Sequence, residues 1–112
     1  MGNVTPKALD YYVREDGTAP FTDWFDELEV GAQARVRGRL NRVASGNLGK
    51  VRSVGEGVHE LKFKDKGFPT YRIYFGNDGE SVIILLLGGD KSSQENDIDL
   101  AKEYWDDYKQ NK

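Results

Sequence analysis

The sequence contains no cysteine and only one histidine, His59, among its 112 residues. Without cysteine the chain forms no disulfide, binds no metal through thiolates and uses no cysteine nucleophile. A single histidine argues against a metal site built from histidines. These shortages predict a domain that carries no metal and no cofactor of its own.

Long apolar stretches are also missing. No run approaches the roughly 18 apolar residues that indicate a membrane span, and the longest, residues 82–87, suits a buried strand. The first ten residues, MGNVTPKALD, lack the basic and then apolar segments of a secretion signal. A length of 112 residues corresponds to one compact domain. We therefore expect a single cytoplasmic domain over residues 1–112 that does not enter a membrane.

Positive charge is concentrated in one part of an acidic chain. The net charge is −3, yet ten of the sixteen lysine and arginine residues lie between Arg35 and Arg72, beside only three acidic residues. This segment therefore carries +7, whereas residues 1–34 and 73–112 each carry −5. Such a segregated field attracts a polyanion to one face, and RNA or DNA phosphate is the obvious candidate. A solvated basic helix without a ligand is the alternative.

Hydrophobic periodicity and turn signals predict an α+β domain with a small, mostly antiparallel sheet and helices packed against it. The expected order is strand, helix, helix, three strands, helix. Strands are expected at residues 9–15, 59–64, 69–76 and 81–87. Helices are expected to begin near Pro20, after a break at Gly31, and at Asn96. The glycine-rich residues 51–58 indicate a loop, and the apolar run at 81–87 predicts a central strand covered on both faces.

The alternation of the predicted strands places cationic side chains beside a tyrosine. If the apolar residues of these strands face the helices, Lys62, Arg72 and Tyr74 share the opposite, open face. The planar fork of an arginine can bind two phosphate oxygens, and a lysine adds a point charge. Lys91, just after the central strand, could join them. The alternative is that these are ordinary residues on the solvent side of a sheet.

Metal-independent RNA cleavage requires activation of the 2′-hydroxyl, stabilisation of charge on the phosphate, and protonation of the leaving 5′-oxygen. Arg72 could stabilise the charge. The proton transfers could be made by one of four side chains if neighbouring cations depress a lysine or tyrosine pKa: Tyr74, Lys62, His59 or Lys91. His59 has the most suitable intrinsic pKa, but its place in the alternation favours the core side.

A second group of cations follows one side of the second predicted helix and continues beyond it. Its members are candidates for contacts with RNA or rRNA: Arg35, Arg39, Arg42, Lys50 and Arg52. The carboxylates form no convincing site, and those of the last helix are interpreted as its solvated face: Asp97, Asp99, Asp106 and Asp107. Glu56 and Glu60 are interpreted as flanking the basic region.

Several motifs, in order from about Leu9 to Lys109, are shared with a known family. They are YYVREDGTAPFTDWFDEL, the arginine-rich second helix, VGEGVHELKF, YRIYFG and LLLGGDKSSQENDIDLAKEYWDDYK. Together they resemble the RelE/HigB-like toxins of type II toxin–antitoxin modules, especially the phage-type branch of addiction-module killer proteins.

This resemblance implies a microbial RNase-type fold with a twisted antiparallel sheet, a helical hairpin and a C-terminal helix. It also implies ribosome-dependent, metal-independent cleavage of mRNA, inhibition of translation, and neutralisation by a cognate antitoxin, usually a helix-turn-helix DNA-binding protein. The active-site cations of the family fall at Lys62 within ELK, Arg72 within YRIYF and Lys91 within GGDK.

The sequence departs from the family pattern in three ways. Relatives often have ELR where Lys62 stands in ELK, so the bidentate fork is lost there. The terminal catalytic tyrosine or histidine of some relatives has no clear counterpart after Lys91, and the chain is acidic rather than strongly basic. Two other functions therefore stay open: a ParE-like inhibitor of DNA gyrase, and a weakened toxin that only binds its antitoxin in autorepression. An acidic antitoxin segment could cover the helix arginines or the sheet face.

Overall fold

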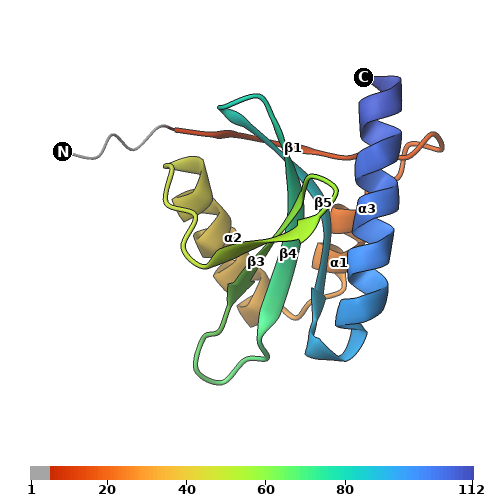
Figure 1. Cartoon of the computed structure of the whole chain (residues 1–112). Coiled ribbons are helices and arrows are strands. Elements are labelled where there is room, and N and C mark those ends of the chain that lie inside the picture. The colour runs from red at the N-terminus through yellow and green to blue at the C-terminus, as the bar shows by residue number, and fades with distance from the viewer. Residues whose placement is uncertain (1–5) are drawn as a thin grey trace.

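The computed structural model of the chain describes residues 6–112 and shows a five-stranded sheet between helices (Figure 1). The strands are β1 (Ala8–Tyr11), β2 (Val51–Gly55), β3 (Val58–Phe63), β4 (Tyr71–Asp78) and β5 (Val82–Asp90). The helices are α1 (Pro20–Asp26), α2 (Val30–Ala44) and α3 (Gln94–Asn111), and the 3-10 turn η1 (Lys91–Ser93) joins β5 to α3. The strand order is β1-β5-β4-β3-β2, with β1 parallel to β5 and the other pairs antiparallel. The predicted α+β class is confirmed, and the arrangement is consistent with a RelE-like fold.

The helices cover the two faces of the sheet and create two apolar cores. On one face, α1 and α2 pack against the sheet through a core that includes Phe21, Val36 and Leu40. On the other face, α3 packs through Ala101 and Trp105. Residues 82–86 of β5 alternate between the two cores, as the pleat of a strand requires. The pairing with β4 then shifts by one residue, and Leu87 lies in the same core as Leu86. The prediction of a central strand covered on both faces is therefore confirmed.

The expected loop at residues 51–58 is wrong, because this segment forms β2, a tight turn and the start of β3. The turn contains Glu56 and Gly57 with φ of 55° and 84°, a left-handed backbone that glycine adopts freely. Val51 and Val54 of β2 pack against opposite cores. The glycines therefore serve a hairpin, and the order becomes strand, helix, helix, four strands, helix.

Other element boundaries differ from prediction by a few residues. The first strand ends at Tyr11, although the Tyr12 N–H still donates to the Leu85 carbonyl at 3.0 Å. The break between the first two helices lies at residues 27–29, and Gly31 instead belongs to α2, where an added Cβ would lie 3.2 Å from the Phe68 ring. The last helix begins at Gln94, two residues before the expected Asn96. Helix α2 ends at Ala44, and Gly46 follows with a φ of 99°, the left-handed backbone that is common just after a helix end.

Polar contacts at the far end of α3 hold this helix to the rest of the fold. The Tyr12 hydroxyl donates to Asp107 at 2.6 Å, and the Tyr108 hydroxyl donates to Asp78 at the same distance. Each of these bonds joins α3 to a segment that precedes it by many residues in the sequence. No helix within residues 6–112 is both long and apolar enough to span a membrane.

The two tyrosines predict a loss of stability at high pH. Burial and the bond to Asp107 raise the pKa of Tyr12 to about 12, and the bond to Asp78 raises the pKa of Tyr108 to about 12. An unfolded tyrosine has a pKa of about 10, so the stabilisation is fully present below about pH 10 and is lost as the pH rises towards the folded value. We expect the midpoint temperature of thermal unfolding to decrease as the pH is raised from about 9 to about 11.5. The fall should be smaller in the double variant Tyr12→Phe/Tyr108→Phe, and an equal fall would exclude these two groups as its cause.

Candidate functional site

The register of β3 and β4 brings together most of the predicted catalytic side chains. Lys62 is paired with Arg72, and Glu60 is paired with Tyr74, so all four project from the same face of the sheet. The predicted grouping of Lys62, Arg72 and Tyr74 on one face agrees with this register. The face is not open as expected, because α3 packs on it and buries Tyr74 completely. Arg72 keeps only 8% of its surface exposed, whereas Lys62 is exposed.

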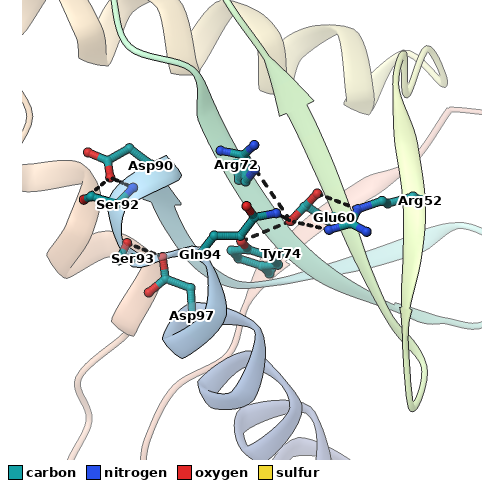
Figure 2. Close-up of polar contacts among 9 residues, drawn as sticks. All are labelled: Arg52, Glu60, Arg72, Tyr74, Asp90, Ser92, Ser93, Gln94 and Asp97. Carbon is teal, nitrogen blue, oxygen red and sulfur yellow. Dashed lines mark hydrogen bonds and ion pairs between the residues drawn. The ribbon is translucent and has the colours of Figure 1, made fainter.

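Glu60 lies at the centre of this group (Figure 2). Its side chain is 3% exposed and receives hydrogen bonds from Arg52 Nε at 2.8 Å, Gln94 Nε2 at 2.9 Å and the Tyr74 hydroxyl at 3.2 Å. Arg72 Nε lies 3.8 Å from the same carboxylate, an ion pair too long to be a hydrogen bond. The carboxylate therefore connects β2, β4 and the first turn of α3.

Arg72 is buried with part of its hydrogen-bonding capacity unused. Its Nε and Nη1 atoms are shielded from solvent and have no hydrogen-bond partner within residues 6–112. Leaving such donors empty in a protein interior is costly, and an anion that fills them recovers this free energy. Its neighbour on β5 is Gly89, and the space that a side chain would take there is occupied by the Asp97 carboxylate. These two unused donors make Arg72 a candidate to bind an oxyanion.

A groove of about 430 Å³ adjoins this cluster and is lined by Lys50, Arg52, Glu60 and Lys62 together with Gly49 and Val51. We call this groove, with its three cations Lys50, Arg52 and Lys62, the basic groove. The Arg52 side chain is 60% exposed, so it can contact both Glu60 and a molecule in the groove. Three cations against one carboxylate give the groove a positive field, which suits a phosphodiester strand.

The ionisation of the cluster follows from these contacts. Burial alone would raise the pKa of Glu60, but the hydrogen bonds from Arg52, Gln94 and Tyr74 bring it below its ordinary value. Glu60 is therefore ionised at neutral pH. Burial raises the pKa of Tyr74 well above its usual range, and Glu60 raises it further. The condition under which Tyr74 could transfer a proton, a pKa lowered by neighbouring cations, is therefore not met, because burial and the carboxylate dominate.

The remaining candidates for proton transfer lie outside the cluster. His59 projects to the opposite face, where its ring stacks on Phe75 with centroids 5.4 Å apart. This is the core-side position that the strand alternation favours, and it separates His59 from Arg72. Lys91 is exposed in η1, beyond the end of β5, where Asp90 accepts a hydrogen bond from the Ser92 N–H at 2.9 Å.

The predicted RNA-binding cations divide into two groups. Lys50 and Arg52 belong to the basic groove, but Arg35, Arg39 and Arg42 lie on α2, which covers the other face of the sheet. The three α2 arginines line a separate groove of about 330 Å³. Arg39 donates hydrogen bonds to the carbonyls of residues 47 and 48, at 3.5 and 2.6 Å. These bonds hold the segment that leads into β2 against α2. The α2 arginines therefore do not extend the surface around Arg72.

Two residues of the α3 first turn were not predicted to be near the site. Gln94 has no role in the sequence analysis, yet it donates a hydrogen bond to Glu60. Asp97 was interpreted as part of a solvated face, but it is only 7% exposed and accepts a hydrogen bond from Ser93 Oγ at 2.6 Å. A Cβ at Gly89 would lie 2.0 Å from Asp97 Oδ2, so the glycine provides the space that this carboxylate occupies. The paired glycines at the end of β5 were the one sequence signal for this close approach.

Sequence comparisons identify the family of the chain. The chain belongs to the family of phage-derived, Gp49-like proteins (DUF891), whose model matches residues 23–106. This family is associated with toxin–antitoxin modules, which implies an antitoxin partner. A protein of Haemophilus influenzae (strain ATCC 51907 / DSM 11121 / KW20 / Rd), described as "Uncharacterized protein", is 41% identical over 86 residues, which cover 76% of this chain and 85% of that protein. The matched range of the family contains the basic groove, Arg72 and Gln94.

Proposed function

We propose that this chain is the toxin of a type II toxin–antitoxin module and an endoribonuclease that cleaves mRNA on the ribosome and so inhibits translation. The observation that carries the proposal is the buried Arg72 guanidinium, which has two unfilled nitrogen donors beside the basic groove. The association of the family with toxin–antitoxin modules supports the toxin assignment. The resemblance to RelE/HigB toxins supports a cytoplasmic site of action and a helix-turn-helix antitoxin.

The chemistry that fits this site is attack of a ribose 2′-oxygen on the adjacent phosphorus. The 2′-O–P bond forms, the P–O5′ bond breaks, the 2′-hydroxyl gives its proton to a base, and the 5′-oxygen takes up a proton. The products are a 2′,3′-cyclic phosphate and a 5′-hydroxyl. The phosphorane that forms on the way carries two negative charges, which Arg72 and Lys62 are placed to stabilise. Lys62 and Lys91 are the solvent-exposed members of the shortlist for the proton transfers.

The proposed mechanism is metal-independent, as in the toxins that the sequence resembles. Charge stabilisation is assigned to the cations of the basic groove and to Arg72. RNA cleavage that persists in excess EDTA would agree with this assignment.

Lys62 offers a direct test, because it is exposed and its replacement leaves both cores intact. We expect wild-type protein, expressed without antitoxin, to arrest growth and create new mRNA 5′-ends inside translated codons. Lys62→Ala should reduce the number of new ends by about tenfold or more, since one charge-stabilising donor is removed. Lys66→Ala is the matched control, because Lys66 is also exposed but lies in the β3–β4 connection.

Other outcomes lead to the alternatives. Growth arrest without new mRNA ends, unaffected by Lys62→Ala, would reject the nuclease and direct attention to inhibition of DNA gyrase. If the folded wild-type protein does not slow growth, the chain is better explained as an antitoxin-binding module in autorepression.

A further inference from the structure

Glu60 is the buried carboxylate on which the candidate site converges, and the mechanism above gives it no role. Its oxygens already contact groups from three other positions in the fold: Arg52 on β2, Arg72 and Tyr74 on β4, and Gln94 on α3 (Figure 2). A carboxylate held in this way has little freedom to rotate or to take up another ligand. The arrangement is therefore that of a fixed internal anion.

The contacts of Glu60 argue against direct participation in proton transfer. Oε1 accepts from Arg52 Nε at 2.8 Å, while Oε2 accepts from Gln94 and Tyr74 and lies 3.5 Å from Arg52 Nη2. Both oxygens are thus occupied, and the side chain is 3% exposed. A general base must reach the proton that it removes. Glu60 therefore acts through its neighbours rather than on the substrate.

Glu60 neutralises the charge of Arg72 without occupying its hydrogen-bond donors. At 3.8 Å from Nε, the carboxylate lies beyond hydrogen-bond distance but close enough for strong Coulomb attraction in a buried site. A buried guanidinium with no counter-charge would be driven towards solvent. Glu60 is the ion-pair partner of Arg72 within residues 6–112, so it holds the guanidinium inside while Nε and Nη1 stay empty.

The charges of the basic groove and of Arg72 also favour the reaction. Lys50, Arg52, Lys62 and Arg72 carry four positive charges and Glu60 carries one negative charge, which leaves a balance of three positive charges. A phosphodiester carries one negative charge, and the phosphorane formed by attack of the 2′-oxygen carries two. The site is thus closer in charge to the transition state than to the bound substrate, which is the condition for catalysis by differential binding.

We propose that Glu60 is a positioning residue that keeps Arg72 buried, oriented and unfilled for the scissile phosphate, and that Gln94 fixes Glu60 so that this geometry depends on the docking of α3. The inference rests on the proposed nuclease function for its catalytic consequence. The link through Gln94 follows from the place of this residue in the first turn of α3, where its amide reaches the carboxylate across the sheet face.

The test is the isosteric variant Glu60→Gln, studied by NMR of the ¹⁵N-labelled chain. Removing the negative charge should release the guanidinium, so exchange of the Arg72 Nε–H with water should accelerate by about tenfold or more. Arg37, which is exposed and lies over the Phe25 ring, supplies a reference signal in the same spectrum that should not change. Gln94→Leu retains the charge of Glu60 but removes its anchor, and an intermediate acceleration is expected.

Cleavage provides the second readout. In Glu60→Gln, the rate of mRNA cleavage at saturating ribosomes should fall by about tenfold or more, while binding of an RNA with 2′-O-methyl groups should change by less than about threefold. A purely structural role would instead lower both in proportion to the folded fraction. If Glu60→Gln does not fold, the same two measurements on Gln94→Leu decide the matter.

Two results would overturn the proposal: unchanged exchange at Arg72 in the folded variants, or accelerated exchange with cleavage at the wild-type rate. Failure of the nuclease function is distinguishable from both. In that event the wild-type protein would not cleave mRNA at all, and the Arg72 exchange rates would still show whether Glu60 holds the guanidinium.

Discussion

Replacing Arg72 with methionine is expected to abolish growth arrest and to lower mRNA cleavage by a factor of about 10² to 10³. Methionine retains an unbranched stem up to the position of Nε, but it has neither the charge nor the nitrogen donors that are unpaired in the wild-type protein. The loss should appear in the rate at saturating ribosomes, because these donors are filled most strongly when charge develops on the phosphate.

Arg72→Lys separates the charge from its geometry. A lysine retains one positive charge beside Glu60 but cannot present two nitrogen donors in one plane, so cleavage should be intermediate between wild type and Arg72→Met. Rates must be expressed per folded molecule, since Arg72 is buried and its loss disturbs the pairing of Glu60. Wild-type cleavage by folded Arg72→Met would contradict the location of the site.

Replacing Trp105 with alanine should remove about 3 to 5 kcal/mol from the free energy of unfolding. The Trp105 ring is buried between the sheet and α3, where it stacks on Tyr108 with centroids 5.3 Å apart. Domains of this size typically have about 5 to 15 kcal/mol in total, so much of the stability should be lost. Urea unfolding followed by circular dichroism measures the change. Lys109 is exposed, and its Nζ lies 5.8 Å from the centre of the Trp105 ring. Lys109→Ala is the control and should lower the free energy of unfolding by less than about 1 kcal/mol.

The bare backbone at Gly76 provides a check on this interpretation. A Cβ added at Gly76 would lie 2.5 Å from Trp105 Cε3, so Gly76→Ala should destabilise the wild-type protein by about 1 to 3 kcal/mol through overpacking. In the Trp105→Ala background the same methyl group enters empty space and should cost much less. Additive effects of the two substitutions would show that the ring does not rest on this glycine.

The sequence contained enough information to place the cations of the site on one face. Alternation along β3 and β4 assigned Lys62, Arg72 and Tyr74 to the same side, and it also favoured the core side for His59. Period-2 patterning reports which face a side chain occupies, since successive residues of a strand point in opposite directions. It does not report which helix covers that face, and the burial of Tyr74 under α3 was therefore missed.

The errors at Glu60, Gln94 and Asp97 share a physical cause. Charged and amide side chains are usually exposed, so a single sequence gives no reason to bury them unless their partners are known. The partners of Glu60 come from three other elements, β2, β4 and α3, and Gln94 lies 34 residues away from it in the sequence. The failure to predict β2 has the same cause, because its glycines form a turn that is defined only by the pairing of β2 with β3. Local patterns predicted the elements, whereas the polar network depends on how they assemble.

The parallel pairing of β1 with β5 has a consequence for the folding of the chain during its synthesis on the ribosome. Ala8 is bonded in register with Val82, so the first strand has no partner until nearly all of the sheet has been translated. Closing such a long loop is slow and entropically unfavourable, and nascent chains with unsatisfied strands are prone to misfold. The Arg72 cluster is completed later still, when Gln94 of α3 emerges. If the proposed function holds, a growing chain is expected to stay harmless to the ribosome that makes it, and an antitoxin can bind it between release and folding.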